Sequence, residues 1–238
     1  MTRRRWIADE ISGDKAALLA DHADHLVRVL RARIGQEFDI ATGTTVRRGR
    51  ITSLSNQRVE FELGGEISGA ILPQITLLLS IFKFDAMEWA IEKCTELGVS
   101  QFVPVIARRT DVHLANASVK RSERWRRIAL QASEQSRRPW PPEIAMPIKL
   151  SNALNATAGL RIVLAENEDR TMLRDVVERD ASSGIVLAIG PEGGWTDSEL
   201  QLFQQSDWIP ASLGQTTLRA ETAAIAATAI ASAALARL

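Results

Sequence analysis

From Pro73 onward, apolar runs alternate with helical segments, and this alternation most constrains what the chain can fold into. Strand-like runs without charge occur at "ITLLLSIF", "FVPVIA" and "GIVLAIG". Strands that are apolar on both faces need cover on both faces, which helices provide on either side of a parallel sheet. We therefore expect residues 73–238 to form an α/β domain with a parallel sheet.

The other segments of this region extend the same pattern. Further strands are expected at residues 143–148, 161–166 and 208–214. Helices are expected at residues 85–97, 119–135, 172–180 and 197–205, from about residue 152, and over the C-terminal segment. Ligands of such sheets bind beyond the carboxyl ends of the strands. Three of these ends carry conspicuous residues: 163–166, 188–194 and 211–214.

Residues 1–72 have a different sequence pattern. Short strand-like runs at 37–42, 46–55 and 58–64 are separated by glycines, with one helical stretch from about Asp21 to Arg31. This predicts a small β-barrel domain. Residues 66–74 would be the linker to the second domain.

Composition excludes several classes of protein. Cys94 is the single cysteine, so no internal disulfide can form, and a reducing, cytoplasmic location is expected. Three histidines without ligand spacing predict no metal site. The basic N-terminus has no apolar stretch for a signal peptide. Ten of the last nineteen residues are alanine, which predicts a closely packed helix and no membrane span.

Basic residues concentrate in one segment of an otherwise balanced chain. Lys+Arg and Asp+Glu both number 29, but residues 108–140 hold nine basic and three acidic residues. Beside them, Trp125 and Trp140 would suit base stacking, and the arginines would suit phosphate contact. The alternative is a solvated helix face whose arginines pair with acidic residues nearer the C-terminus.

The segment "IGPEGGWTDSEL", from Ile189 to Leu200, joins an expected strand to an expected helix. It lacks the Gly-Lys-Ser/Thr of a phosphate loop and the Gly-x-Gly-x-x-Gly of a dinucleotide fold. Its lack of side-chain bulk would let a ligand meet bare backbone groups, but a plain structural turn would have the same composition.

Two stretches together, "IGPEGGWTDSEL" and "LGQTTLRAETAAIAA", resemble the paired signature of SPOUT-class methyltransferases, and more narrowly the family that methylates N3 of a uridine in small-subunit ribosomal RNA. Further stretches are similar to that family in the same order along the chain. They are "DHLVRVLRARIGQEFDI", "KFDAMEWAIEKCTELGVSQFVPV" and "RWRRIALQASEQSRRPWPPEI".

The resemblance implies a deep trefoil knot in residues 73–238, a PUA-like RNA-binding barrel in residues 1–72, and a homodimer. Because the Ala-rich final helix allows close backbone approach, we expect the first and last helices of the C-terminal domain at the dimer interface. The resemblance also implies S-adenosylmethionine as methyl donor and ribosomal RNA, in the assembled small subunit, as partner. The implied cofactor residues are Leu164, Ala165, Glu166, Ile189, Gly190, Pro191, Glu192, Gly193, Gly194, Ser212, Leu213, Gly214, Thr217, Leu218 and Thr222. The RNA-binding candidates are Arg4, Arg28, Arg31, Arg108, Arg109, Lys120, Arg121, Arg124, Arg127 and Arg138.

Methylation of uridine N3 requires removal of an imide proton. Glu221 is the candidate general base, and Arg219 is the candidate for stabilising charge on the uracil oxygens. The alternative is that both residues fix the start of the last helix. Glu192 would either hold a cofactor group or cap the helix entered at Thr196.

One departure from the family pattern concerns Thr216 and Thr217, which stand where the family usually has an arginine and an aliphatic residue. This leaves open an RNA-binding or ribosome-assembly protein that has lost the chemistry. A nucleotide-binding α/β enzyme unrelated to RNA is a third possibility, which the basic segment and the barrel disfavour.

Overall fold

The structure, a computed structural model, describes residues 5–43, 45–67, 74–154, 159–180 and 184–235. The chain divides into two compact units. The first comprises Met1–Ile71 with Ser133–Pro141, and the second comprises Leu72–Ala132 with Pro142–Leu238. The expected linker falls largely outside the described residues.

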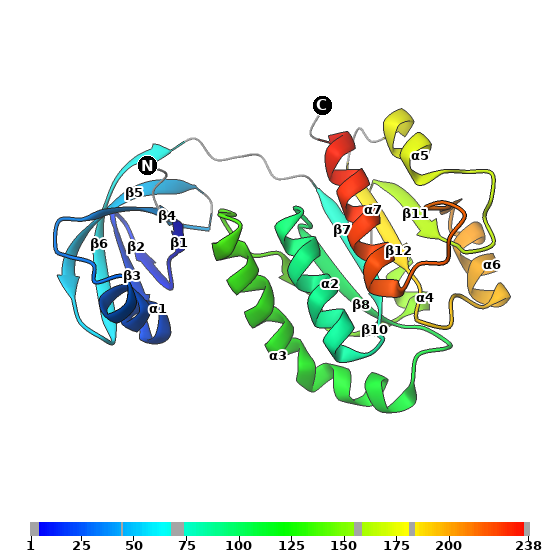
Figure 1. The fold of residues 1–238 in the computed structure, drawn as a ribbon, viewed down its shortest axis with the longest axis horizontal. Helices are drawn as coiled ribbons and strands as arrows, with labels where there is room; N and C mark the ends of the chain where they lie inside the picture. Colours follow the sequence, from blue (N-terminus) through cyan, green and yellow to red (C-terminus); the bar gives the residue numbers. More distant parts are fainter. Residues whose placement is uncertain (1–4, 44, 68–73, 155–158, 181–183, 236–238) are drawn as a thin grey trace. The chain divides into compact units, whose positions relative to one another are not determined.

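A parallel sheet forms the centre of the second unit, as the alternation predicts (Figure 1). Its strand order is β10-β8-β7-β12-β11-β13, with β9 also beside β8, and every pairing is parallel. The strands are β7 (Ile75–Ser80), β8 (Gln101–Ile106), β9 (Glu143–Ile144), β10 (Ile148–Lys149), β11 (Leu160–Leu164), β12 (Ile185–Ile189) and β13 (Ile209–Ala211).

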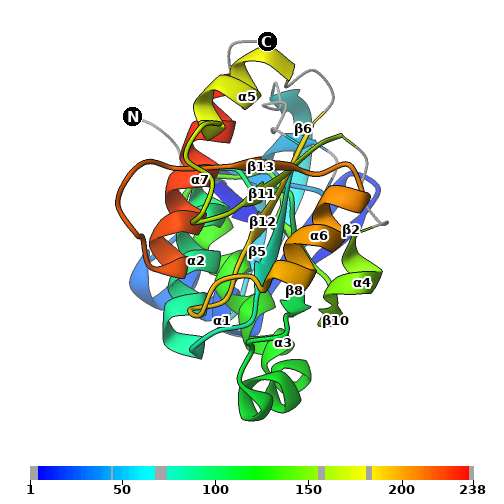
Figure 2. The ribbon, with the colours of Figure 1, turned by 90° about the vertical axis from the view of Figure 1, so that its right-hand side faces the viewer.

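Helices cover both faces of this sheet (Figure 2). On one face lie α2 (Phe84–Glu96), α5 (Leu173–Asp180) and α7 (Ala220–Leu235), and residues of α3 (Val112–Gln135) join the same apolar core. On the other face lie α4 (Leu150–Ala153) and α6 (Asp197–Gln205), with a second core. The central strand β12 is buried along its whole length, because side chains on both of its faces contact helices.

Alanines of α7 pack inside this unit. Ala220, Ala224, Ala227 and Ala231 are buried in the core shared with α2. Their spacing of three and four residues places them on one face of the helix, where small side chains allow close approach. The close packing expected of the final helix is therefore used within the chain.

Two of the differences from the predicted element boundaries have a local cause. Helix α3 begins seven residues earlier than expected, because the Asp111 carboxylate accepts the N–H groups of His113 and Leu114 and caps it there. The expected strand 143–148 is two short strands, β9 and β10. Pro147 lies between them and has no N–H for strand pairing.

The first unit is a curled six-stranded sheet of order β1-β4-β5-β6-β3-β2. The edge strands β1 and β2 are separated in the chain only by Ala8 and Asp9, so the sheet bends until its edges approach each other. Among the strands that the structure describes here, only β1 and β4 pair in parallel; the other pairs are antiparallel. The strands are β1 (Arg5–Ile7), β2 (Glu10–Ser12), β3 (Lys15–Leu19), β4 (Glu37–Ala41), β5 (Val46–Leu54) and β6 (Arg58–Ile67).

The last three of these strands are confirmed predictions, whereas β1, β2 and β3 have no strand signal that we identified in the sequence. The expected helix is shorter and in two pieces, α1 (Ala20–Asp24) and a π-helical turn η1 (His25–Val29). Large side chains fill the interior of this unit, among them Trp6, Leu26 and Phe61. Trp6 therefore packs in the core and is not available to stack on a base.

Within the described residues, no helix has the length and apolar character that crossing a membrane requires.

Candidate active site

A cleft of about 800 Å³ opens at the carboxyl ends of β11, β12 and β13. It is lined by the segments that follow these strands, together with Lys83, Ala86 and Arg109. This is where α/β sheets bind ligands, because the loops after neighbouring parallel strands meet at one edge. The three strand ends singled out in the sequence thus form one site.

Nearly all of the predicted cofactor residues line this cleft. They are Leu164, Ala165, Glu166, Ile189, Gly190, Pro191, Glu192, Gly193, Gly194, Ser212, Leu213, Gly214, Thr217 and Leu218. Arg219 and Glu221 line it as well. Thr222 is exposed on the first turn of α7 and does not line the cleft, so its predicted contact with the cofactor is not supported by its position.

The turn from Gly190 to Gly194 is closely surrounded, which explains its glycines. A Cβ atom on Gly190 would lie 3.3 Å from the indole nitrogen of Trp195, and one on Gly193 would lie 3.3 Å from the Cδ atom of Arg109. Gly194 has a φ of +69°, and its N–H donates to the Pro191 carbonyl at 2.8 Å. The backbone of this turn therefore forms the surface of the cleft directly.

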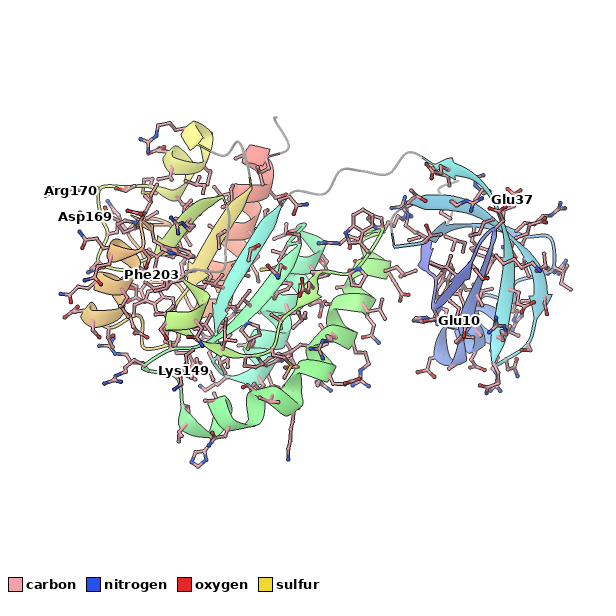
Figure 3. All side chains as sticks on the ribbon, turned by 180° about the vertical axis from the view of Figure 1, so that it is seen from behind. Glu10, Glu37, Lys149, Asp169, Arg170 and Phe203 are labelled. Carbon is pink, nitrogen blue, oxygen red and sulfur yellow. The ribbon has the colours of Figure 1, made fainter. Side chains whose placement is uncertain are left out.

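Trp195 connects two of the strand ends, and the sequence analysis did not single it out. Its indole N–H donates to the Leu164 carbonyl at 3.1 Å, which joins the turn after β12 to the end of β11. Its ring meets Phe203 of α6 edge to face, with centroids 4.9 Å apart. Figure 3 shows Phe203 on the inner side of α6, toward the sheet. Its place directly after the glycines is the sequence signal that could have identified Trp195.

The third strand end is joined to the segment after β11. The Ser212 N–H donates to the Thr171 carbonyl at 2.8 Å, and the Ser212 carbonyl accepts the N–H of Leu173 at 2.9 Å. Its hydroxyl accepts the N–H of Gly214 at 3.2 Å, where a φ of +135° requires glycine. The three segments that line the cleft are therefore connected by hydrogen bonds: the Trp195 indole links the turn after β12 to the end of β11, and the Ala165 N–H donates to the Ala211 carbonyl at 3.1 Å.

Glu199, and not Glu192, caps helix α6. Thr196 and Glu199 form a reciprocal capping box, in which Glu199 accepts the N–H of Thr196 at 2.9 Å. Glu199 also accepts the N–H of Arg108 at 2.7 Å. Glu192 is exposed, with its carboxylate 3.7 Å from the Lys83 ammonium, so the capping role considered for it is wrong. The Thr-x-x-Glu spacing is a sequence signature that identifies Glu199.

Arg219 and Glu221 lie where the last helix begins, beside the cleft. Glu221 is 8% exposed and sits in the first turn of α7, where a carboxylate interacts favourably with the helix dipole. Arg219 is exposed. Neither side chain has a hydrogen-bonding or ionic partner among the described residues, so both are available to a ligand in the cleft.

The structure separates the basic residues of segment 108–140. Arg121 and Arg124 each lie 2.8 Å from the carboxylate of Glu88 on α2, so these two stabilise the packing of α3. Trp125 is fully buried, with its ring centroid 5.9 Å from that of Phe84, and cannot stack on a base. The pairing of arginines with acidic residues thus holds for part of the segment, although the partner is on α2 and not nearer the C-terminus.

Two more of the RNA-binding candidates, Arg138 and Arg109, contact the protein itself. Arg138 is 4% exposed, and burial lowers its pKa to about 10, so it does not reach an RNA backbone at the surface. Arg109 donates to backbone carbonyls of the cleft. Arg108, Lys120 and Arg127 remain exposed, as do Arg28 and Arg31 of the first unit, with Arg28 paired to Asp24. Arg4 lies outside the described residues.

Comparison with known proteins places this geometry in a family. Residues 70–232 match the model of the RNA methyltransferase domain. The ribosomal RNA small subunit methyltransferase E of Synechocystis is 36% identical over 84% of this chain and 66% of its own length. The crystal structure of the enzyme of that name from Neisseria gonorrhoeae is 31% identical, covers 96% of both chains, and superimposes with a TM-score of 0.83. The chain belongs to the ribosomal RNA small subunit methyltransferase E family.

Two related structures also contain a ligand. The Neisseria gonorrhoeae enzyme is bound to S-adenosyl methionine. A putative methyltransferase from Legionella pneumophila is in complex with the bound cofactor SAM, is 28% identical over 98% of both chains, and has a TM-score of 0.85. Both of these structures match the chain over its two units.

Proposed function

We propose that this protein transfers the methyl group of S-adenosylmethionine to N3 of a uridine in small-subunit ribosomal RNA. The observation that carries the proposal is the glycine-lined cleft with Arg219 and Glu221 at its edge, in a chain of this family. We further propose the assembled small subunit, in the cytoplasm, as the setting of the reaction.

The cleft suits S-adenosylmethionine in size and chemistry. Its volume is typical of sites for cofactor-sized ligands. Leu164, Ile189 and Leu218 offer apolar contacts for a base, while the exposed backbone of the turn after β12 offers hydrogen bonds to polar groups. The four glycines at Gly190, Gly193, Gly194 and Gly214 keep this backbone accessible. When bound, the cofactor supplies a methyl group on a positively charged sulfur.

Glu221 and Arg219 take the roles that the uridine requires. The N3–H proton passes to the Glu221 carboxylate as the N3–C bond forms and the methyl–sulfur bond breaks, leaving S-adenosylhomocysteine and methylated uridine. Arg219 stabilises the negative charge that develops on the two uracil oxygens. A base extruded from its stack would reach this cleft at a cost of a few kcal/mol, and less if the strand is already unpaired.

The test of Glu221 is single-turnover methylation. Glu221→Gln should reduce the rate by about 10²-fold or more, because a positioned general base contributes about 10²–10⁴-fold. Raising the pH should partly restore the rate by ionising the imide directly. Arg219→Ala should lower the rate without such a pH effect, since it accepts no proton.

The exposed barrel residue Glu62 provides the control, and Glu62→Gln should methylate at the parent rate. If Glu221→Gln also methylates at the parent rate with saturating cofactor and RNA, Glu221 acts only at the start of the helix. Cofactor binding without any methyl transfer by the unaltered protein would favour an RNA-binding protein without the chemistry, as the departure at Thr216 and Thr217 leaves open.

The proposal includes a deep trefoil knot in the second unit and an RNA-binding, PUA-like barrel in the first. The pairing of Ser212 with residues 171–173, followed by the return of the chain to α7 against α2, supports the knot. The exposed Arg28 and Arg31 support RNA contact by the barrel. A crystal structure that traces residues 155–219 without a break tests the knot.

A further inference from the structure

Arg109 follows β8 and contacts the turn after β12, 84 residues later in the chain. Its Nη1 donates to the Gly193 carbonyl at 2.6 Å and lies 3.4 Å from the Trp195 carbonyl. Its aliphatic part fills the space beside Gly193, since a Cβ there would lie 3.3 Å from Cδ and 3.6 Å from Cβ of Arg109. One side chain therefore meets the turn through both its charged head and its stem.

These contacts fix the orientation of two peptide units. The unit between Gly193 and Gly194 has its oxygen bonded to Arg109 and its N–H bonded to the Pro191 carbonyl at 2.8 Å. The unit between Trp195 and Thr196 has its oxygen near Arg109 and its N–H bonded to Glu199 at 2.9 Å. A peptide bonded at both ends cannot rotate without losing a hydrogen bond.

The same bonding leaves other backbone groups of the turn available. The N–H groups of Glu192 and Gly193 have no acceptor among the residues that the structure describes, and both residues line the cleft. Adjacent free N–H groups in a fixed turn make a site for a ligand oxygen. Their direction depends on the neighbouring peptide units that Arg109 holds.

We propose that Arg109 is a positioning residue, which orients the turn Gly190–Gly194 for S-adenosylmethionine, and not an RNA contact. The proposal rests on the function proposed above. Glycines leave this turn many conformations, so a guanidinium bonded to its carbonyls reduces the cost of ordering it on binding. A hydrogen bond from a charged donor is also stronger than a neutral one.

The test measures cofactor and RNA binding separately. By calorimetry, Arg109→Ala should bind S-adenosylmethionine about tenfold or more weakly, from the loss of a charge-assisted hydrogen bond. The salt dependence of RNA binding should stay at the parent slope. Arg174→Ala is the matched control, because Arg174 is an exposed arginine of α5 whose only ionic partner in the described part of the chain is its neighbour Asp175.

Two further measurements separate positioning from general stability. Guanidinium ion at low concentration should restore part of the affinity of Arg109→Ala, and Arg109→Lys should have intermediate affinity, because an ammonium bonds one carbonyl less well than the guanidinium does. The midpoint of thermal unfolding without cofactor should match that of Arg174→Ala.

Parental cofactor affinity in Arg109→Ala would overturn the inference, as would a salt slope lowered by about 0.7–0.9, the value for one lost phosphate contact. Weak binding together with a lower unfolding midpoint and no guanidinium rescue would also overturn it, in favour of a role in stability. Failure of the unaltered protein to bind the cofactor would contradict the proposed function itself.

Discussion

At the scale of single residues, the cleft depends on positions where no side chain fits. A Cβ atom on Gly193 would lie 3.3 Å from the Cδ atom of Arg109. The larger side chain of Gly193→Val would therefore displace either Arg109 or the turn. We expect this variant to lose binding of S-adenosylmethionine in calorimetry while the protein remains folded.

Gly65→Val is the control for Gly193→Val, because a Cβ on Gly65 would meet no atom within 4 Å. It should bind the cofactor like the parent. Unchanged affinity in Gly193→Val would mean that the ligand does not meet this turn.

At the scale of elements, α3 presents basic residues in two different environments. Arg121 and Arg124 pair with Glu88 of α2, while Lys120 and Arg127 are exposed. If the exposed pair contacts RNA phosphates, replacing both with alanine should lower the slope of log affinity against log salt by about 0.7–0.9 for each contact.

Arg121 and Arg124 provide the matched comparison for α3. Replacing them with alanine should leave the salt slope of RNA binding unchanged and lower the free energy of unfolding, because the Glu88 side chain is 10% exposed and its carboxylate would lose its partners. A parental salt slope for both double variants would mean that none of the four residues contacts RNA phosphates.

At the scale of the whole molecule, we propose that the protein forms a homodimer through α2 and α7. These helices pack side by side on one face of the sheet (Figure 2), and Trp89 of α2 is 50% exposed. A large exposed aromatic side chain is typical of an interface anchor. Light scattering should give the mass of a dimer for the parent and of a monomer for Trp89→Glu.

Leu202 is the control for this interface, since it is 40% exposed on α6, which covers the opposite face of the sheet. Leu202→Glu should remain dimeric. A monomeric parent at micromolar concentration would contradict the dimer.

The sequence by itself determined the parallel sheet and the three strand ends that form the cleft. Continuous apolar runs identify strands buried on both faces, because each residue's polarity reflects its own surroundings. Parallel strands bring their carboxyl ends to one edge, so Leu164, Ile189 and Ser212 could be grouped without coordinates. The glycines between β12 and α6 marked the same place.

Only the tertiary structure decided which charged side chains are free and which support the fold. Arg124 differs from Arg127 because Glu88 lies opposite one and not the other, 36 residues away in the chain. The contacts of the Arg109 guanidinium likewise lie on a turn 84 residues later in the chain. Sequence periodicity reports whether a position is buried, whereas the partner of a charge is set by how distant elements pack.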